Sequence, residues 1–75
     1  MKPAQPLTLD AISAEVARAR IKFPSQSRET IYIALCEEVG ELAKAILERA
    51  DEDHLQLEAI QVAAMAVRFI EECGL

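Results

Sequence analysis

The stretch CEEVGELAKA, residues 36–45, combines a helical apolar pattern with a carboxylate where an apolar side chain would be expected. With about 100° of rotation per residue, Ile31, Leu35, Leu42 and Ala45 all fall within about 60° of Glu38 on a helical wheel. Burying a lone carboxylate is costly unless it is paired, hydrogen-bonded or bound to a cation. The stretch therefore predicts a helix whose apolar stripe contains an acid that needs compensation.

This helix is expected to run from about residue 28 to residue 49, since no proline interrupts the segment. Ser25 or Ser27 can cap its start. Gly40 is the only glycine in the segment, and a glycine at an exposed helix position costs roughly 1 kcal/mol relative to alanine. Its presence indicates that something packs close to the backbone there.

A helix with the same irregularity is expected at about residues 54–73. Glu58 lies in the middle of its apolar stripe, with Leu55, Val62, Met65 and Phe69 within about 60° of it. Gln61 follows Glu58 at the offset that Glu41 holds to Glu38. Both helices thus present an acid among apolar neighbours and a polar group one turn later.

The ends of the remaining segments follow from local signals. Residues 1–7 contain two prolines and no periodicity, which predicts a loose arm. Thr8 can cap a first helix at about residues 9–23, which must end before Pro24. The other expected signals are a capping box formed by Asp53 and Gln56 before the third helix and Gly74 just after it.

The composition favours one small helical domain spanning residues 1–75. Hydrophobic residues make up 52% of the chain and aromatic residues 4%, and a core of this size rarely supplies much stability alone. The net charge of −5 repels a phosphate backbone, so nucleic-acid binding is not expected. No membrane-spanning segment or signal peptide is expected. Cys36 and Cys73 lack metal-ligand spacing and are interpreted as reduced thiols in a cytoplasmic protein.

The third helix is also apolar on its second face, which carries Ala59, Ile60, Ala63, Val67 and Ile70. A helix that is hydrophobic all round must be buried on both sides. We therefore expect an all-α fold in which a short N-terminal helix packs outside a long antiparallel helical hairpin. Two such hairpins would pair into a homodimer with a four-helix-bundle-like core, or assemble further into a homotetramer.

Facing helices of a bundle bring Glu38, Glu41 and Glu58 within reach of one another. Three carboxylates cannot share a dry space without a cation, and Mg²⁺ is the hard divalent ion that such oxygen ligands favour. The alternative is that the acids reach a solvated groove or pair with nearby cations, which are Arg20, Lys44, Arg49 and Arg68. That alternative describes a plain helical interaction module.

The segment EEVGEL, residues 37–42, followed by EAIQVAAMAVRF, residues 58–69, resembles the MazG-like all-α nucleoside triphosphate pyrophosphohydrolases. The family signature is ExxE on one helix and ExxD on the next, and its acids bind Mg²⁺ around the nucleotide phosphates. ExxE corresponds to Glu38 and Glu41, preceded by Glu37, and ExxD corresponds to Glu58 and Gln61. The resemblance covers about residues 28–72.

The chain departs from this signature at Gln61, where the family has aspartate. An amide oxygen can still ligate Mg²⁺ or hold a metal-bound water, but it carries no charge and cannot act as a base. Reduced activity, altered substrate choice or loss of catalysis are all compatible with this change. A non-catalytic oligomerisation or nucleotide-sensing module of the same fold is therefore the alternative to an enzyme.

The resemblance implies Mg²⁺-dependent hydrolysis, with Mn²⁺ as a possible substitute, of a nucleoside triphosphate to the monophosphate and pyrophosphate. Glu37 and Glu38 are the implied catalytic residues, and the implied metal ligands are Glu38, Glu41, Glu58 and Gln61. Lys44, Arg28 and Arg68 are candidates for phosphate contacts, with a solvated or ion-paired role as the alternative for each. His54 is expected to be an ordinary surface residue.

Overall fold

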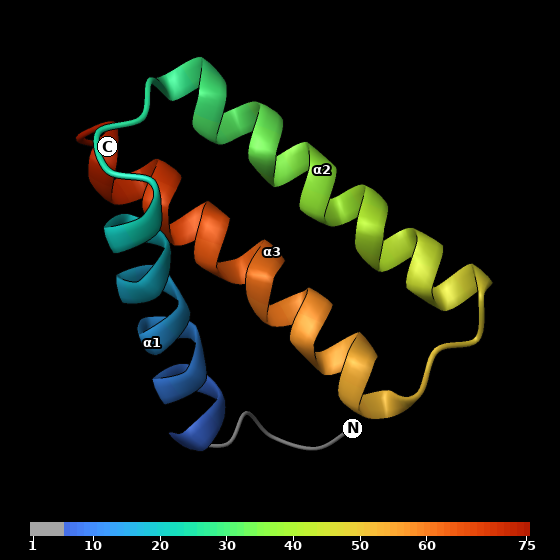
Figure 1. Cartoon of the computed structure of the whole chain (residues 1–75). Helices are drawn as coiled ribbons and strands as arrows, with labels where there is room; N and C mark the ends of the chain where they lie inside the picture. Colours follow the sequence, from blue (N-terminus) through green and yellow to red (C-terminus); the bar gives the residue numbers. More distant parts are fainter. Residues whose placement is uncertain (1–5) are drawn as a thin grey trace.

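The computed structural model describes residues 6–75, and over this range the chain forms three α-helices and no strand. They are α1 (Pro6–Lys22), α2 (Arg28–Leu47) and α3 (Glu52–Glu72). Figure 1 shows α3 between the other two, with α2 and α3 running in opposite directions. Both α1 and α2 pack against α3, whereas within the described range α1 does not contact α2. The expected all-α fold is confirmed.

The helix ends differ from the expected positions by up to three residues. Pro6 begins α1, because a proline suits the first turn of a helix. The expected cap Thr8 is therefore inside α1, and most of the expected arm at 1–7 lies outside the described residues. Ser27, one of the two candidate caps, does cap α2 by accepting a hydrogen bond from Thr30 N at 3.1 Å. Asp51 rather than Asp53 caps α3 by accepting from His54 N at 2.9 Å.

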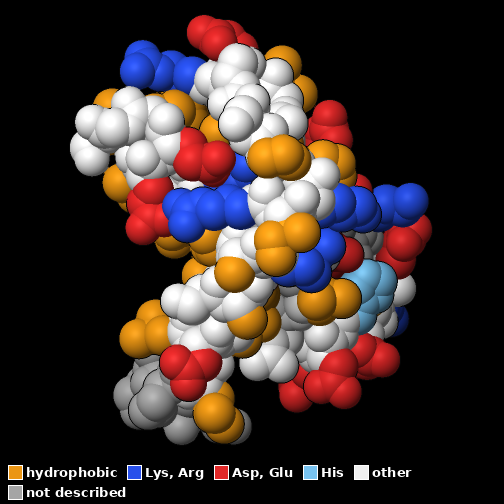
Figure 2. Space-filling view, turned by 60° about the vertical axis from the view of Figure 1, so that its left-hand side comes forward, with side chains coloured by type: hydrophobic (Ala, Val, Ile, Leu, Met, Phe, Trp, Pro, Cys, Tyr) orange, Lys and Arg blue, Asp and Glu red, His pale blue; other side chains and the backbone are white. Residues whose placement is uncertain are grey.

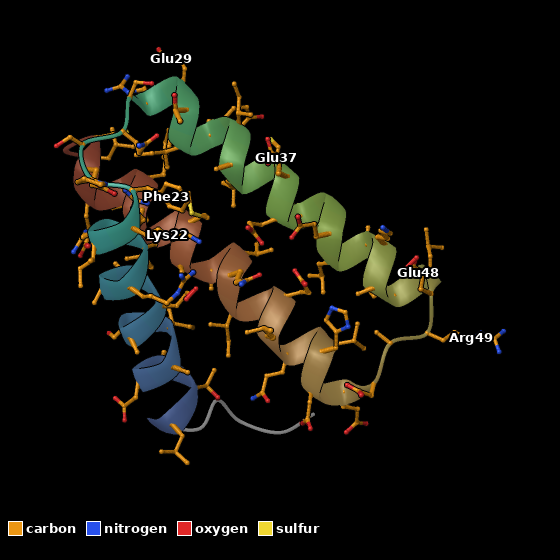
Figure 3. The ribbon with its side chains drawn as sticks, in the orientation of Figure 1. Lys22, Phe23, Glu29, Glu37, Glu48 and Arg49 are labelled. Carbon is orange, nitrogen blue, oxygen red and sulfur yellow. The ribbon has the colours of Figure 1, made fainter. Side chains whose placement is uncertain are left out.

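The loop between α2 and α3 contains a left-handed residue. Arg49 has a φ of 56° and points into solvent (Figure 3). Its N–H donates to Ile46 O, and Ala50 N donates to Ala45 O at 2.9 Å, which is the Schellman arrangement. This ends α2 at Leu47, two residues before the expected end. Gly74 has a φ of 70° just past α3, as expected.

The core is small and is centred on α3. Its buried apolar residues are Val16 and Ala19 of α1, Ile31 and Ala45 of α2, and Ala64 of α3. Among the described side chains, twelve large hydrophobic ones remain exposed, and on the face drawn in Figure 2 such side chains lie among charged ones at the surface. The chain by itself therefore leaves much apolar surface in contact with water.

The second apolar face of α3, which we expected a partner subunit to cover, is partly covered by α1. Val67 of α3 lines a shallow groove with Ile12 and Val16 of α1, and Arg20 forms an ion pair with Glu71 across the same pair of helices. α1 therefore covers part of the face that was assigned to a partner subunit, whereas Ala59 and Ile70 of that face are exposed. The helical bundle formed by two hairpins remains a prediction.

Among the described helices, none has the length and apolar character needed to cross a membrane.

Candidate metal site

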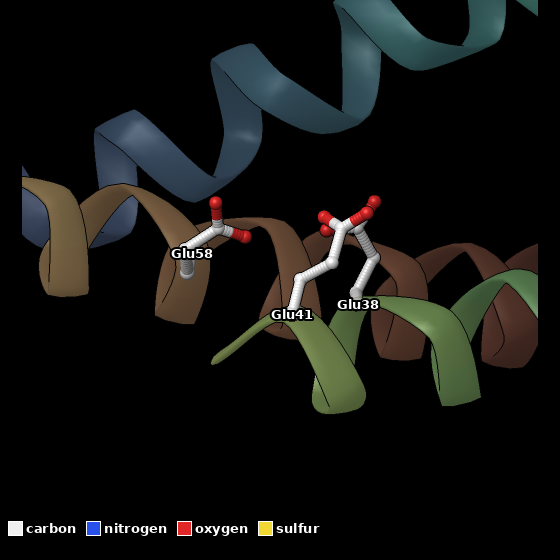
Figure 4. Close-up of side chains that lie close together, drawn as sticks. All are labelled: Glu38, Glu41 and Glu58. Atoms are coloured by element: carbon white, nitrogen blue, oxygen red, sulfur yellow. The ribbon is translucent and has the colours of Figure 1, made fainter. Parts of the chain in front are cut away.

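Three carboxylates from two helices converge near the middle of the α2–α3 packing. Glu38 and Glu41 extend from α2 and Glu58 from α3, and one carboxylate oxygen of each lies within 4.8 Å of the others. Figure 4 shows the carboxylate of Glu58 directed toward the other two. Glu38 and Glu58 are half-buried, whereas Glu41 is exposed. This arrangement, the acid cluster hereafter, has the carboxylate oxygens that a hard divalent cation takes as ligands.

The electrostatics of the acid cluster disfavour three negative charges without a cation. Desolvation raises the pKa of Glu38 above its ordinary value of 4.5, and the charges of Glu41 and Glu58 raise it further. A bound divalent cation would reverse this effect, because it favours the ionised form of every carboxylate around it. The residues present therefore fit a Mg²⁺ or Mn²⁺ ion.

Gln61 joins the two sides of the acid cluster. With its amide nitrogen facing the acids, Gln61 Nε2 donates to Glu38 Oε2 at 3.1 Å and to Glu58 Oε2 at 3.3 Å. An aspartate, as in the family signature, would have no proton to donate here at neutral pH. Gln61 therefore compensates part of the negative charge with hydrogen bonds, which an additional acid could not do without a metal.

His54 lies beside the acid cluster, which the sequence interpretation missed. Its Nε2 is 3.2 Å from Glu58 Oε1, within hydrogen-bonding distance. The signal was present in the sequence, because residues four apart on a helix face the same side. A histidine bonded to a ligating carboxylate can fix the orientation of that carboxylate.

A cavity of about 310 Å³ opens next to the acid cluster and is lined by residues of α1, α2 and α3. Its lining includes Glu37, Glu38 and Gln61 at the acid cluster and Phe23, Gln26, Thr30 and Met65 elsewhere. Its volume lies at the lower end of the range of small-molecule sites, about 300–1,000 Å³. The acid cluster therefore has an adjoining space that can hold part of a small ligand.

Arg18 of α1 is a second residue that the sequence interpretation missed. It lines the cavity and donates to Glu15 Oε1 at 2.6 Å. This hydrogen bond raises the pKa of Arg18, and the charge of Glu38 contributes to the same effect. Arg18 thus brings a guanidinium to the α1 side of the cavity, where it is paired with the carboxylate of Glu15, which also lines the cavity.

The structure distributes the three candidate phosphate-binding residues differently. Arg68 lines the cavity but is only 1% exposed; it donates to Glu72 Oε2 at 2.5 Å and to Phe23 O at 2.8 Å. Arg28 and Lys44 are exposed on α2 and are not among the described residues that line the cavity. Of the three, Arg68 is the one placed beside the candidate site.

Comparison of the chain with models of protein families, with curated proteins and with solved structures gives no match.

Proposed function

We propose that this chain is a Mg²⁺-dependent hydrolase that converts a nucleoside triphosphate to its monophosphate and pyrophosphate. The observation that carries the proposal is the convergence of Glu38, Glu41 and Glu58 within 4.8 Å. These acids belong to the ExxE and ExxQ segments that resemble the pyrophosphohydrolase signature. The cavity beside them supports a ligand that extends beyond its metal-bound phosphates.

In this proposal Glu38, Glu41 and Glu58 hold the cation, and Gln61 holds a metal-bound water or supplies its amide oxygen. When bound, the metal neutralises the phosphate charges and acidifies water. Glu37 lines the cavity next to Glu38 and accepts the proton of the attacking water. Water attacks the α-phosphorus, and the bond between the α-phosphorus and the oxygen that bridges to the β-phosphate breaks. Pyrophosphate leaves with the bridging oxygen, and the α-phosphate gains the oxygen of the water.

Positive groups around the cavity would place the substrate. Arg18 supplies a charge from α1 that reaches the acid cluster, and Arg68 forms part of the cavity wall. Lys44 and Arg28 remain candidates for contacts with phosphates that extend outside the cavity. The proposal includes homodimers or homotetramers with a four-helix core and a cytoplasmic location. It includes no role for nucleic acid or membranes.

A specific observation favours the second candidate, a non-catalytic nucleotide-sensing or oligomerisation module of the same fold. Gln61 satisfies two acids with its own amide, so the acid cluster is partly compensated without a metal. In such a module the metal and nucleotide would bind without cleavage of the phosphate chain. The two functions therefore differ in turnover and share the binding site.

The test measures pyrophosphate release from a panel of standard and modified nucleoside triphosphates with Mg²⁺ or Mn²⁺, and Mg²⁺ binding by calorimetry. Glu38→Gln removes one charged ligand at constant size, and Glu29→Gln is the matched control at an exposed position in the first turn of α2. Loss of a residue that merely supports a metal ligand lowers metal affinity or activity by about 10–100-fold. Glu38→Gln should therefore lower Mg²⁺ affinity and the rate of pyrophosphate release at least as much, whereas Glu29→Gln should leave both unchanged.

Glu38→Gln should not unfold the protein, because it removes the carboxylate that its neighbours destabilise. Mg²⁺ binding without turnover of any substrate would support the non-catalytic module instead. Absence of Mg²⁺ binding, with Glu38→Gln and Glu29→Gln behaving alike, would overturn both candidates and leave a helical interaction module.

A further inference from the structure

The outward face of α2, opposite the acid cluster, is an apolar surface with no partner in the described chain. Its eight residues, Tyr32, Ile33, Cys36, Val39, Gly40, Ala43, Ile46 and Leu47, are all exposed. On a helical wheel they occupy about 140° centred away from Glu38. This set of residues, the outer α2 face hereafter, includes Leu47 at 83% exposure and Ile33 at 56%.

We propose that the outer α2 face binds the same face of a second copy of this chain, antiparallel, with the two helices crossing at Val39 and Gly40. The proposal rests on the packing of the described residues and is independent of the proposed catalytic activity. It differs from the dimer expected from the sequence, since its contact is through α2 and not through the second face of α3.

The order of side chains along the outer α2 face is symmetric about the midpoint between Val39 and Gly40. Two bulky residues, 32 and 33, begin it and two more, 46 and 47, end it, with the small residues at 36 and 43 equally far from the midpoint. A twofold contact pairs residue i with j and residue j with i. In the antiparallel arrangement Tyr32 meets Leu47, Ile33 meets Ile46, Cys36 meets Ala43, and Val39 meets Gly40. The spacing is common to every helix face, whereas the match of bulky with bulky and of small with small side chains is what suits a second copy of the same face.

Gly40 is the second observation that points to a close neighbour from outside the chain. A glycine inside a helix lowers its stability, so something should require it. A Cβ atom added at Gly40 would meet no atom within 4 Å, and its φ is not in the left-handed region. No described residue of the chain comes close enough to need a glycine here, whereas a helix crossing at this point could approach closely because Gly40 has no side chain.

The outer α2 face also carries large apolar side chains that a second copy would cover. Leu47 is 83% exposed, Ile46 59%, Tyr32 57% and Ile33 56%. A second copy on the outer α2 face would remove these side chains from water while leaving the acid cluster, on the opposite side of α2, open.

The first test is the oligomeric state of the full chain by sedimentation equilibrium without added metal. The wild type should have twice the mass of 8.3 kDa. Ile33→Glu should raise the dimer dissociation constant more than about 30-fold, because it places a charge in the apolar contact with Ile46 of the second copy. The matched control is Ile21→Glu, because Ile21 is an 84% exposed isoleucine on α1 and should leave the mass unchanged. Circular dichroism should show unchanged helix content per residue in both variants.

A gentler variant separates the interface from helix stability. Gly40→Ala should strengthen α2 as a helix yet weaken the dimer, because a methyl group would intervene at the crossing. A monomeric wild type would overturn the proposal. It would also be overturned if Ile33→Glu and Ile21→Glu had the same mass, or if Gly40→Ala left the dimer as tight as before.

The antiparallel register has its own test in a Cys73→Ser background. Ala43→Cys places a thiol opposite Cys36 of the second copy, so mild oxidation with copper–phenanthroline should give a covalent dimer with two thiols oxidised per bond formed. The parent, which retains only Cys36, should stay uncrosslinked. A disulfide-linked dimer of the parent would indicate parallel helices, and no crosslink in Ala43→Cys would place the interface elsewhere; either result would overturn the proposed register.

Discussion

Replacement of Gln61 by glutamate should destabilise the metal-free protein and strengthen metal binding at the same time. Gln61→Glu keeps the length of the side chain but exchanges the amide nitrogen that donates to Glu38 and Glu58 for an oxygen of a fourth carboxylate. A hydrogen bond to a charged group contributes about 1.5–3 kcal/mol. Because Glu38 and Glu58 are only half-buried, water compensates part of this loss, and we expect a net destabilisation of about 2 kcal/mol.

The assay is thermal unfolding at neutral pH with EDTA and then with Mg²⁺. For a domain of 60–100 residues, about 2 kcal/mol corresponds to a Tm lowered by roughly 8–16 °C. Gln56→Glu is the control, since it makes the same chemical change at an exposed position of α3 and should change stability by less than about 0.5 kcal/mol. Mg²⁺ at ten times its Kd should add about 1.4 kcal/mol to the free energy of unfolding. Gln61→Glu should gain this stabilisation at a lower Mg²⁺ concentration than the wild type.

Two results would refute this reasoning. Equal Tm values for Gln61→Glu and Gln56→Glu in EDTA would show that Gln61 does not hold the acids together. An equal Mg²⁺ requirement for Gln61→Glu and the wild type would show that position 61 does not face the metal. Lowering the pH should restore the stability of Gln61→Glu, because a protonated carboxyl can again donate to its neighbours.

Three further predictions concern pH, a buried ion pair and a helix end. The folded-state pKa of Glu38 is raised above 4.5. As the pH increases from 4.5 through that raised value, the unfolding free energy of the metal-free protein should fall, because Glu38 must ionise in the folded state. Over the same pH range the Mg²⁺ affinity measured by calorimetry should rise, because the ionised carboxylate binds the metal. Arg68→Ala removes the buried cation that pairs with Glu72 and should lower the unfolding free energy, measured with denaturant, by about 3 kcal/mol. The control Arg20→Ala breaks an exposed ion pair and should lower it by less than about 1 kcal/mol. Arg49→Gly should raise the Tm by relieving a left-handed residue, a gain of about 0.5–1 kcal/mol, whereas Glu48→Gly one residue earlier should lower it.

The position of each acid on its helix could be predicted from the sequence because helical periodicity alone determines it. The wheel places Glu38 and Glu58 inside apolar stripes, and the structure brings them together with Glu41. The start of α3 was harder to predict, because Asp51 and Asp53 are both good caps. The left-handed Arg49 that ends α2 sets where the loop begins, and no sequence signal such as glycine marks that residue.

The contribution of α1 to the site could not be predicted from periodicity. An amphipathic pattern indicates which face of a helix is buried but not which neighbour covers it. The sequence therefore gave no reason to place Arg18 near the acid cluster or Phe23 O beside Arg68. The hydrogen bonds of Gln61 were equally inaccessible, since they depend on the distance between two helices.

The separation between α1 and α2 has a consequence for how this site could diversify. All three clustered acids come from α2 and α3, whereas α1 contributes only wall residues of the cavity, such as Glu15, Arg18 and Ala19. Substitutions in α1 can therefore reshape the wall of the cavity without touching the acid cluster. Chains that share the acid cluster could acquire distinct specificities by exchanging their first helix alone.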